Sequence, residues 1–237
     1  MKIYLIPTII SDETEHATIA PQVLEIISKI DVFFVEDIRT SRRYISKLMK
    51  LLPDESRKKI ETLSFEIVDK DTTEQVVSRL IKGYEEKEII GILSESGCPG
   101  IADPGSLIVK IGHSFGHKII PLPGPSSIFL ALMASGMNGQ NFVFHGYLPI
   151  EDKLLRQKLE KIESIAERIS QTQIFIETPY RNQRLFDHLI KYMNHNTSLC
   201  IATDLTGLQE NILTQSIQKW KKSNLQLPKL PTVFLLI

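Results

Sequence analysis

Residues 94–105 read SESGCPGIADPG, and this stretch indicates how the chain folds and where it binds a ligand. It contains three glycines, two prolines and two carboxylic acids, and it directly follows the apolar run EIIGIL at 88–93. The apolar run predicts a buried strand, and SLIVKIGHSFG at 106–116 predicts a helix after it. The stretch is therefore expected at the carboxyl end of a parallel strand, where ligands bind in open α/β sheets.

The composition of this stretch favours a ligand loop over a plain surface turn. Glycine permits positive φ and close approach of the backbone, while Pro99 and Pro104 fix the loop in advance. Neither G-x-x-x-x-G-K-[ST] nor G-x-G-x-x-G occurs here, and Glu95 and Asp103 would repel a phosphate. We therefore predict a ligand that is neutral or cationic near the loop and offers hydroxyl or ammonium groups.

The alternation of short apolar runs with amphipathic segments continues along the whole chain and predicts an α/β fold. We expect two α/β domains of similar size, 1–120 and 121–237, divided near 119–124, where prolines and a glycine punctuate the chain. The N-terminal sheet should be mainly parallel and the C-terminal sheet mixed, with the ligand cleft between the domains. Further strands are expected at 2–7, 32–37, 117–123, 141–148, 172–178, 198–205 and 231–237. Further helices are expected at 18–30, 39–50, 73–86, 127–136, 151–169 and 181–193.

Bulk composition leaves the class of partner open, so any argument for nucleic acid binding must rest on local patches of charge. Among the 237 residues, Lys+Arg and Asp+Glu number 28 each, so the whole-chain charge gives no argument for nucleic acid or membrane binding. Cys98 and Cys200 are the only cysteines and lack metal-type spacing, so we expect no metal site and a reducing, cytoplasmic environment. The opening MKIYLIPTII is too short to span a membrane and is expected to form a buried strand.

Two other stretches place acids at the ends of predicted strands. VEDIRTSRR at 35–43 brings Glu36, Asp37 and Arg39 to the start of a helix, and FIETPYR at 175–181 has a similar pattern. A carboxylate pair at a helix start can cap the helix or act on a substrate, and the spacing leaves both possibilities open. Arg39 can likewise form an ion pair at the helix start or hold a phosphate.

Taken in order, these stretches resemble the tetrapyrrole methylase superfamily of S-adenosylmethionine (SAM) dependent methyltransferases. The branch most similar to this chain methylates the 2′-hydroxyl of a cytidine in small-subunit ribosomal RNA. The resemblance implies two α/β domains with SAM bound in the cleft between them, and a homodimer. It is carried by IPTIISD (6–12), VEDIRTS (35–41), SESGCPGIADPG, PLPGPSS (121–127), GYLP (146–149) and ETPYR (177–181).

The resemblance also implies which residues bind SAM. In the first domain the expected cofactor-binding residues are Pro7, Thr8, Ser94, Glu95, Gly97, Pro99, Gly100, Ile101, Ala102 and Asp103. In the rest of the chain they are Ser126, Ser127, Ala131, Tyr147, Leu148, Leu205, Pro231 and Thr232.

A ribose hydroxyl is a weak nucleophile and benefits from a general base. Glu36 and Asp37 are the candidate catalytic carboxylates, with Arg39 orienting them or holding a phosphate. The helix expected at 39–50 carries Arg43 and Lys47 on one face with Arg42 beside it, and these three are candidate RNA contacts. A solvated helix face explains the same charges without any ligand.

Some positions depart from the pattern of the ribosomal RNA branch. IISD replaces a Gly-Asn pair after the first strand, LSFEIVD at 63–69 keeps only Ser64 and Glu66, and Asp204 and Gly207 stand in TDLTGL. Three hypotheses follow: ribosomal RNA 2′-O-methylation, SAM-dependent methylation of a tetrapyrrole or other small molecule, or SAM binding without catalysis.

Overall fold

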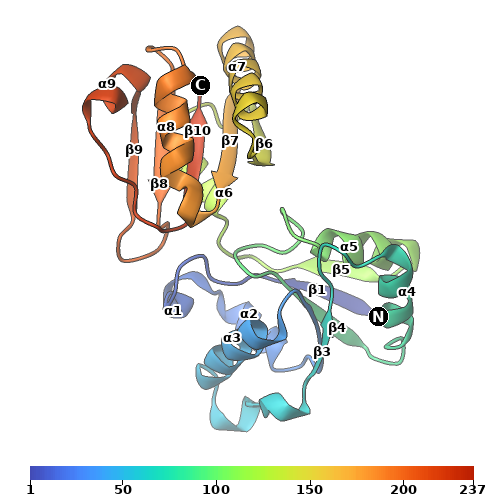
Figure 1. Cartoon of the computed structure of the whole chain (residues 1–237). Coiled ribbons are helices and arrows are strands. Elements are labelled where there is room, and N and C mark those ends of the chain that lie inside the picture. Colours follow the sequence, from blue (N-terminus) through green and yellow to red (C-terminus); the bar gives the residue numbers. More distant parts are fainter. The chain divides into compact units, whose positions relative to one another are not determined.

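The computed structural model describes residues 1–237 and divides them into two compact units, Met1–Ser126 and Ser127–Ile237. Each unit is built on its own five-stranded sheet (Figure 1). The division falls a few residues beyond the boundary expected at residue 120, because the strand Lys118–Pro121 and the proline-rich loop after it belong to the first unit.

The sheet of the first unit is entirely parallel, in the strand order β3-β2-β4-β1-β5. The parallel N-terminal sheet predicted from the sequence is confirmed, but β3 was missed because its SFEI sequence contains no apolar run. The five strands are β1 (Lys2–Ile6), β2 (Val32–Val35), β3 (Ser64–Ile67), β4 (Ile89–Leu93) and β5 (Lys118–Pro121).

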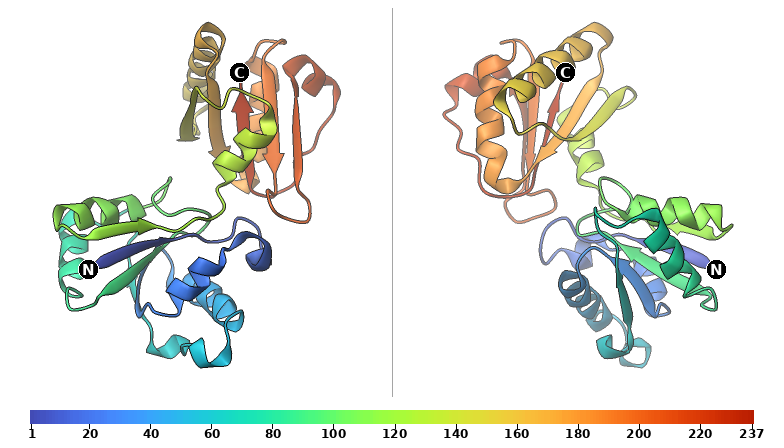
Figure 2. Two further views of the ribbon diagram at one scale, coloured as in Figure 1. Left: turned by 180° about the vertical axis from the view of Figure 1, so that it is seen from behind. Right: turned by 45° about the vertical axis from the view of Figure 1, so that its right-hand side comes forward.

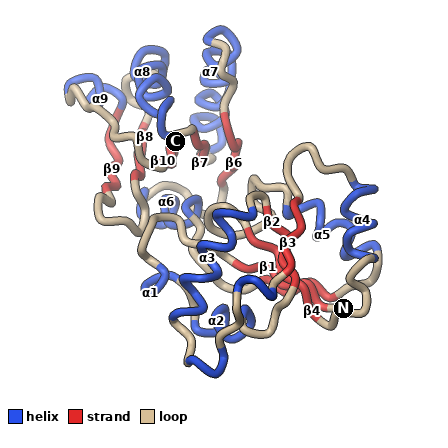
Figure 3. Tube along the Cα trace, turned by 60° about the horizontal axis from the view of Figure 1, so that its bottom comes forward, coloured by secondary structure: helices blue, strands red, loops and turns tan.

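Helices cover both faces of this sheet, with α2 (Pro21–Ile27) and α3 (Ile38–Lys50) on one side (Figures 2 and 3). The other side is covered by α4 (Glu74–Lys82) and α5 (Gly105–Ser114). Successive residues of a strand point to opposite faces. Alternate residues of β2 therefore enter different cores, which is why VFFV is buried along its whole length.

The single helix predicted over 18–30 is wrong. The chain forms a short α1 (Glu15–Thr18), breaks at Ile19 and Ala20, and begins α2 at Pro21. Proline lacks a backbone N–H and is favoured in the first turn of a helix, so Pro21 marks a new start rather than an interior position.

The strand order creates a crevice at the carboxyl ends of β1 and β4. These strands are neighbours, yet β1 leads into α2 on one face and β4 leads into α5 on the other. The two connections therefore diverge and leave room between them, which is the usual ligand position in such sheets. The stretch 94–105 begins at this point.

The second unit has a mixed sheet in the order β6-β7-β10-β8-β9, which confirms the predicted sheet type. Helices α7 (Asp152–Ile169), α8 (Asn182–Tyr192) and α9 (Ile217–Lys222) pack on one face, and α6 (Ser127–Ser135) packs on the other (Figure 2). The strands are β6 (Phe142–Tyr147), β7 (Thr172–Glu177), β8 (Ser198–Thr203), β9 (Asn211–Ser216) and β10 (Thr232–Leu236). Three 3-10 turns complete the chain at Asp54–Ser56, Ile60–Thr62 and Pro179–Arg181.

Aromatic side chains fill the core of this unit. Phe175 and Phe234 stack at 5.9 Å between ring centroids, and Phe186 meets Trp220 edge to face at 5.7 Å. The strand β9 was not predicted, because NILTQS is a partly exposed edge strand with only two apolar residues. The helix α9 was not predicted either, because its six residues are too short to show an amphipathic period. No helix in either unit combines the length and the apolar character needed to cross a lipid bilayer.

Candidate functional site

The loops after β1 and β4 are joined into one surface at the crevice. The backbone N–H of Thr8 donates to the carbonyl of Gly97 at 2.8 Å, and the hydroxyls of Thr8 and Ser94 lie 3.3 Å apart. The Ser94 hydroxyl also donates to the Gly97 carbonyl at 2.8 Å. Three of the predicted cofactor-binding residues are thus held together by direct hydrogen bonds.

The proline-rich loop after β5 closes onto the same surface. A Cβ placed on Gly124 would lie 2.1 Å from the Cβ of Pro7, and one on Gly97 would lie 3.2 Å from the Pro125 carbonyl oxygen. The Cys98 thiol lies 3.3 Å from that same oxygen. Close packing between the loops therefore requires glycine at positions 97 and 124. Ser126, the last residue of the first unit, follows directly after this contact.

The stretch 97–103 forms a cradle, a tight turn whose exposed part is Ile101 and Ala102. Gly97, Gly100 and Ala102 all have positive φ, at 72°, 81° and 60°. Asp103 fixes the turn, because its Oδ1 accepts from the N–H groups of Gly100 at 2.8 Å and Gly105 at 2.7 Å. Pro99 and Ile101 belong to the same turn, and Ile101 is exposed.

The second oxygen of Asp103 supports a ligand at this cradle. Oδ2 is buried and has no hydrogen-bond partner within the protein, and burial raises the pKa of the carboxyl group. A buried acceptor without a donor costs free energy unless something else supplies the donor. A hydroxyl or ammonium group of a ligand would do so, and the residues present therefore fit a SAM-type molecule.

Glu36 lies where β2 ends, beside the carboxylates of the β4 loop. Burial, together with the nearby charges of Asp103 and Glu95, raises the pKa of Glu36 to about 7. A hydrogen bond from the Glu95 backbone N–H acts in the opposite direction and is outweighed. The structure thus brings together a predicted catalytic acid and two predicted cofactor-binding acids, and it holds Glu36 ready to exchange a proton near neutral pH.

Asp37 has a different environment although it is the next residue. It is the N-cap of α3, and its Oδ1 accepts from the backbone N–H of Thr40 at 2.8 Å. This hydrogen bond is the main reason why the pKa of Asp37 lies below its usual value. The neighbouring Arg39 is exposed and makes no hydrogen bond or ion pair through its side chain.

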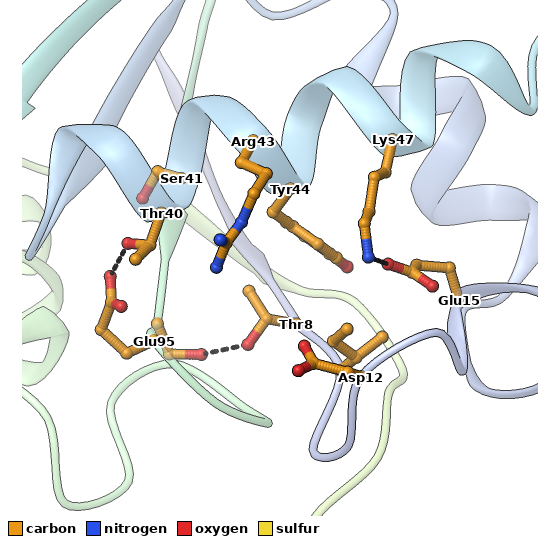
Figure 4. A pocket seen from close by; sticks show the side chains of 11 residues that line it. Thr8, Asp12, Glu15, Thr40, Ser41, Arg43, Tyr44, Lys47 and Glu95 are labelled. Carbon is orange, nitrogen blue, oxygen red and sulfur yellow. Dashed lines mark hydrogen bonds and ion pairs between the residues drawn. The ribbon is translucent and has the colours of Figure 1, made fainter. Parts of the chain in front are cut away.

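A pocket of about 150 Å³ opens at the crevice between the start of α3 and the loops after β1 and β4 (Figure 4). Thr40 bridges its wall, because its hydroxyl donates to Glu95 Oε1 at 2.8 Å. Tyr44, on the same helix, is buried, and its hydroxyl donates to the Pro7 carbonyl at 2.8 Å. The pocket is lined by Thr8, Ile9, Asp12, Glu15, Thr40, Ser41, Arg43, Tyr44, Lys47, Ser94 and Glu95.

The three predicted RNA contacts on α3 have three different environments. Lys47 Nζ is 3.0 Å from Oε1 of Glu15, whose side chain is 8% exposed. Arg42 lies over the Phe65 ring at 5.8 Å from its centroid. Arg43 alone points into the pocket without an ion pair or hydrogen bond (Figure 4).

The remaining predicted cofactor-binding residues lie in the second unit, most of them at one edge of its sheet. Thr232 at the start of β10 pairs with both Glu177 and Thr203, which end β7 and β8. Asn182 is fully buried and donates through Nδ2 to the Leu230 carbonyl at 2.8 Å and to Thr232 Oγ1 at 3.1 Å. Tyr147, Leu148, Leu205 and Pro231 lie at this edge, and Ser127 and Ala131 lie on α6.

Sequence reasoning missed several residues of these sites. Asp12 and Glu15 follow β1, and Tyr44 lies one helical turn beyond Thr40 on α3. Both acids lie in the segment between the first predicted strand and the helix after it, so acids in the connection after a strand are the only signal that could have identified them. The buried Asn182 has no such signal in the sequence.

Comparison with known proteins agrees with this architecture. Residues 12–220 match the family model described as Tetrapyrrole (Corrin/Porphyrin) Methylases. The methyltransferase CobJ has a TM-score of 0.57 at 17% identity, covering 92% of this chain and 87% of that one. Uroporphyrin III C-methyl transferase from Thermus thermophilus has a TM-score of 0.54 at 13% identity, covering 100% and 97%. The fold and the matched model together define a methyltransferase.

The chain belongs to the tetrapyrrole (corrin/porphyrin) methylase family. It is also similar to proteins called ribosomal RNA small subunit methyltransferase I. The one from Vibrio cholerae serotype O1 is 28% identical over 213 residues, covering 89% of this chain and 67% of the relative. The one from Buchnera aphidicola subsp. Acyrthosiphon pisum is 28% identical over 225 residues, covering 94% and 73%. The chain thus spans about two thirds to three quarters of these relatives.

Proposed function

We propose that this chain transfers a methyl group from SAM to the 2′-hydroxyl of a cytidine in small-subunit ribosomal RNA. The observation that carries the proposal is the position of Glu36, a carboxyl group with a pKa of about 7 at the carboxyl edge of the parallel sheet. The names of the curated relatives support ribosomal RNA as the acceptor.

The residues that would hold SAM are those of the cradle and its neighbouring loops. Asp103 Oδ2 lacks a donor, Ala102 is exposed, and the half-buried Gly100 has no side chain to block close approach of a ligand to the backbone. The carboxylates of Glu36, Glu95 and Asp103 make this surface negative, which suits a positively charged sulfonium. When bound, SAM supplies an activated methyl group, so the protein's main tasks are to align the acceptor and to exclude water.

Glu36 would act as the general base. A ribose hydroxyl loses its proton as the methyl group arrives, and a base with a pKa near the working pH serves this transfer best. Asp37 is a weaker base because the helix cap lowers its pKa. Its assigned role is therefore to fix the start of α3, which positions Thr40 and Arg43 at the pocket.

Methylation of purified small ribosomal subunits with labelled SAM tests the proposal. The subunits should come from cells that lack this protein, so that the acceptor is unmodified. Incorporation of label at one cytidine ribose is the expected result, and an unmodified 2′-hydroxyl after mapping by reverse transcription would refute the RNA assignment. Calorimetry with SAM should give one site per chain, and absence of binding would refute the cofactor assignment.

The proposal also includes a homodimer, as the family resemblance implies, and action in the cytoplasm, as the cysteine content favours. Light scattering should then give twice the chain mass of 27.0 kDa. A monomer mass at micromolar concentration would remove the dimer from the proposal and leave the chemistry untouched.

A further inference from the structure

The pocket beneath α3 has the size of a single ring. A cavity of about 150 Å³ is large enough for one benzene-sized ring. A tetrapyrrole macrocycle exceeds that volume. The pocket is therefore suited to a small planar group or to one part of a larger ligand.

The charges around the pocket argue against a phosphate. Its lining includes three carboxylates, from Asp12, Glu15 and Glu95, and two cations, from Arg43 and Lys47. Glu15 and Lys47 neutralise each other at 3.0 Å, and Glu95 accepts from Thr40. A phosphate that entered would meet uncompensated negative charge, so a neutral polar ring is the better occupant.

Two groups in the pocket remain without a partner, and they carry opposite charge. Arg43 projects from α3, and Asp12 projects from the loop after β1 on the opposite wall (Figure 4). Asp12 and Arg43 are both exposed residues, so a ligand can reach them. The pocket thus offers a set of donors from the guanidinium and an acceptor from the carboxylate.

We infer that this pocket binds an aminopyrimidine base, with Asp12 accepting from its exocyclic amine and Arg43 donating to its ring nitrogen or carbonyl. Cytosine presents that pattern, an amine donor beside two acceptors. Uracil presents a carbonyl where the amine would be, and this oxygen would face the Asp12 carboxylate. The inference rests on the proposed function only in assigning the base to the acceptor nucleotide. It would make Asp12 and Arg43 the residues that select cytidine.

Nucleoside binding tests the pocket without any methyl transfer. The protein saturated with S-adenosylhomocysteine is titrated with cytidine and, separately, with uridine, while amide shifts of residues 8–12 and 40–47 are followed by NMR. We expect cytidine to shift these signals and to bind roughly tenfold or more tightly than uridine. The D12N variant should lose most of this preference, because an amide can accept from cytosine or donate to uracil.

The matched control is Glu13→Gln, which removes the neighbouring carboxylate outside the pocket lining and should retain the preference. Equal binding of the two nucleosides by the wild type would overturn the inference. So would a D12N variant that keeps the preference, or one that loses affinity for S-adenosylhomocysteine, because the pocket would then belong to the cofactor. If cytidine binds selectively but ribosomal subunits are not methylated, the proposed function fails and the pocket assignment stands.

Discussion

At the scale of single residues, Glu36 and Asp37 show how position decides the chemistry of two adjacent carboxyl groups. Glu36 is half-buried beside other carboxylates, whereas Asp37 is exposed and accepts a backbone N–H from the first turn of α3. Burial and like charges disfavour ionisation, and a hydrogen bond to the charged form favours it. Only one of the pair is therefore suited to exchange protons near neutral pH.

The first prediction concerns the dependence of methyl transfer on pH. In the wild type, kcat/KM should rise with pH and level off above about 7, as Glu36 becomes a base. Glu36→Gln should lower kcat by roughly 10²–10⁴-fold and abolish the rise. Asp37→Asn is the control, because asparagine also caps helices and the variant should retain the rise. Equal losses in both variants would contradict this division of roles.

The second prediction concerns the stability of the folded chain and follows from the raised pKa of Glu36. Because the pKa of Glu36 in the folded chain is raised to about 7 from an ordinary 4.5, the favourable contribution of its protonated form is complete below pH 4.5. That contribution is lost as the pH rises to about 7. Glu36→Gln should therefore raise the melting temperature at pH 8 relative to the wild type and leave it unchanged at pH 4. A variant less stable than the wild type at pH 8 would show that the ionised carboxylate is favourable there.

At the scale of elements, the site depends on contacts between loops that follow different strands. The loops after β1, β4 and β5 meet at Thr8, Gly97 and Gly124, and the space between Gly124 and Pro7 does not admit a methyl group. Rigid contacts of this kind hold the cradle in one shape before a ligand arrives, which lowers the free-energy cost of binding.

The third prediction tests this packing. Gly124→Ala should lower the free energy of unfolding by about 1–3 kcal/mol, because the added methyl forces Pro7 away. It should also weaken SAM binding measured by calorimetry. Gly139→Ala is the matched control, since no atom lies within 4 Å of a Cβ there, and it should change neither quantity. A Gly124→Ala variant with unaltered stability and SAM affinity would mean that the loops move apart freely.

Most of the elements could be predicted from local pattern, and the site could be predicted only in part. The amphipathic period identified α3 to within one residue, and apolar runs identified the buried strands. The strands β3 and β9 lie at sheet edges with few apolar residues, so they carry no such pattern. Strand order is also absent from local pattern, yet it brings Glu36 at the end of β2 to Glu95 at the end of β4, and the packing of helices then brings Lys47 to Glu15.

At the scale of the whole molecule, the chain has separate cores. The clusters that contain Phe33 and Phe34 lie within the first unit, and the cluster that contains Phe234 lies within the second. Because no cluster includes residues of both units, damage to one core is expected to remain local.

The fourth prediction follows from this separation. Phe234→Ala should cost about 3–5 kcal/mol, since the side chain is fully buried and stacks on Phe175. Hydrogen exchange should then become faster in residues 127–237 and stay unchanged in the β1 and β4 amides. Phe34→Ala provides the reciprocal case, with faster exchange confined to residues 1–126. Faster exchange in both units from either substitution would show that the chain unfolds as one cooperative body.

The central position of β10 determines when, during synthesis of the chain, the sheet of the second unit can be completed. This strand is formed by residues 232–236, and it lies between β7 and β8, which are formed much earlier along the chain. While the chain is being translated, the second unit therefore has a gap in the middle of its sheet until those residues leave the ribosome. The first unit has all its strands by residue 121 and can finish folding during synthesis. A nascent chain stalled before β10 emerges would thus carry a finished first unit and a divided sheet in which the edges of β7 and β8 that β10 normally pairs are open, and chaperones and proteases would meet the chain in that form.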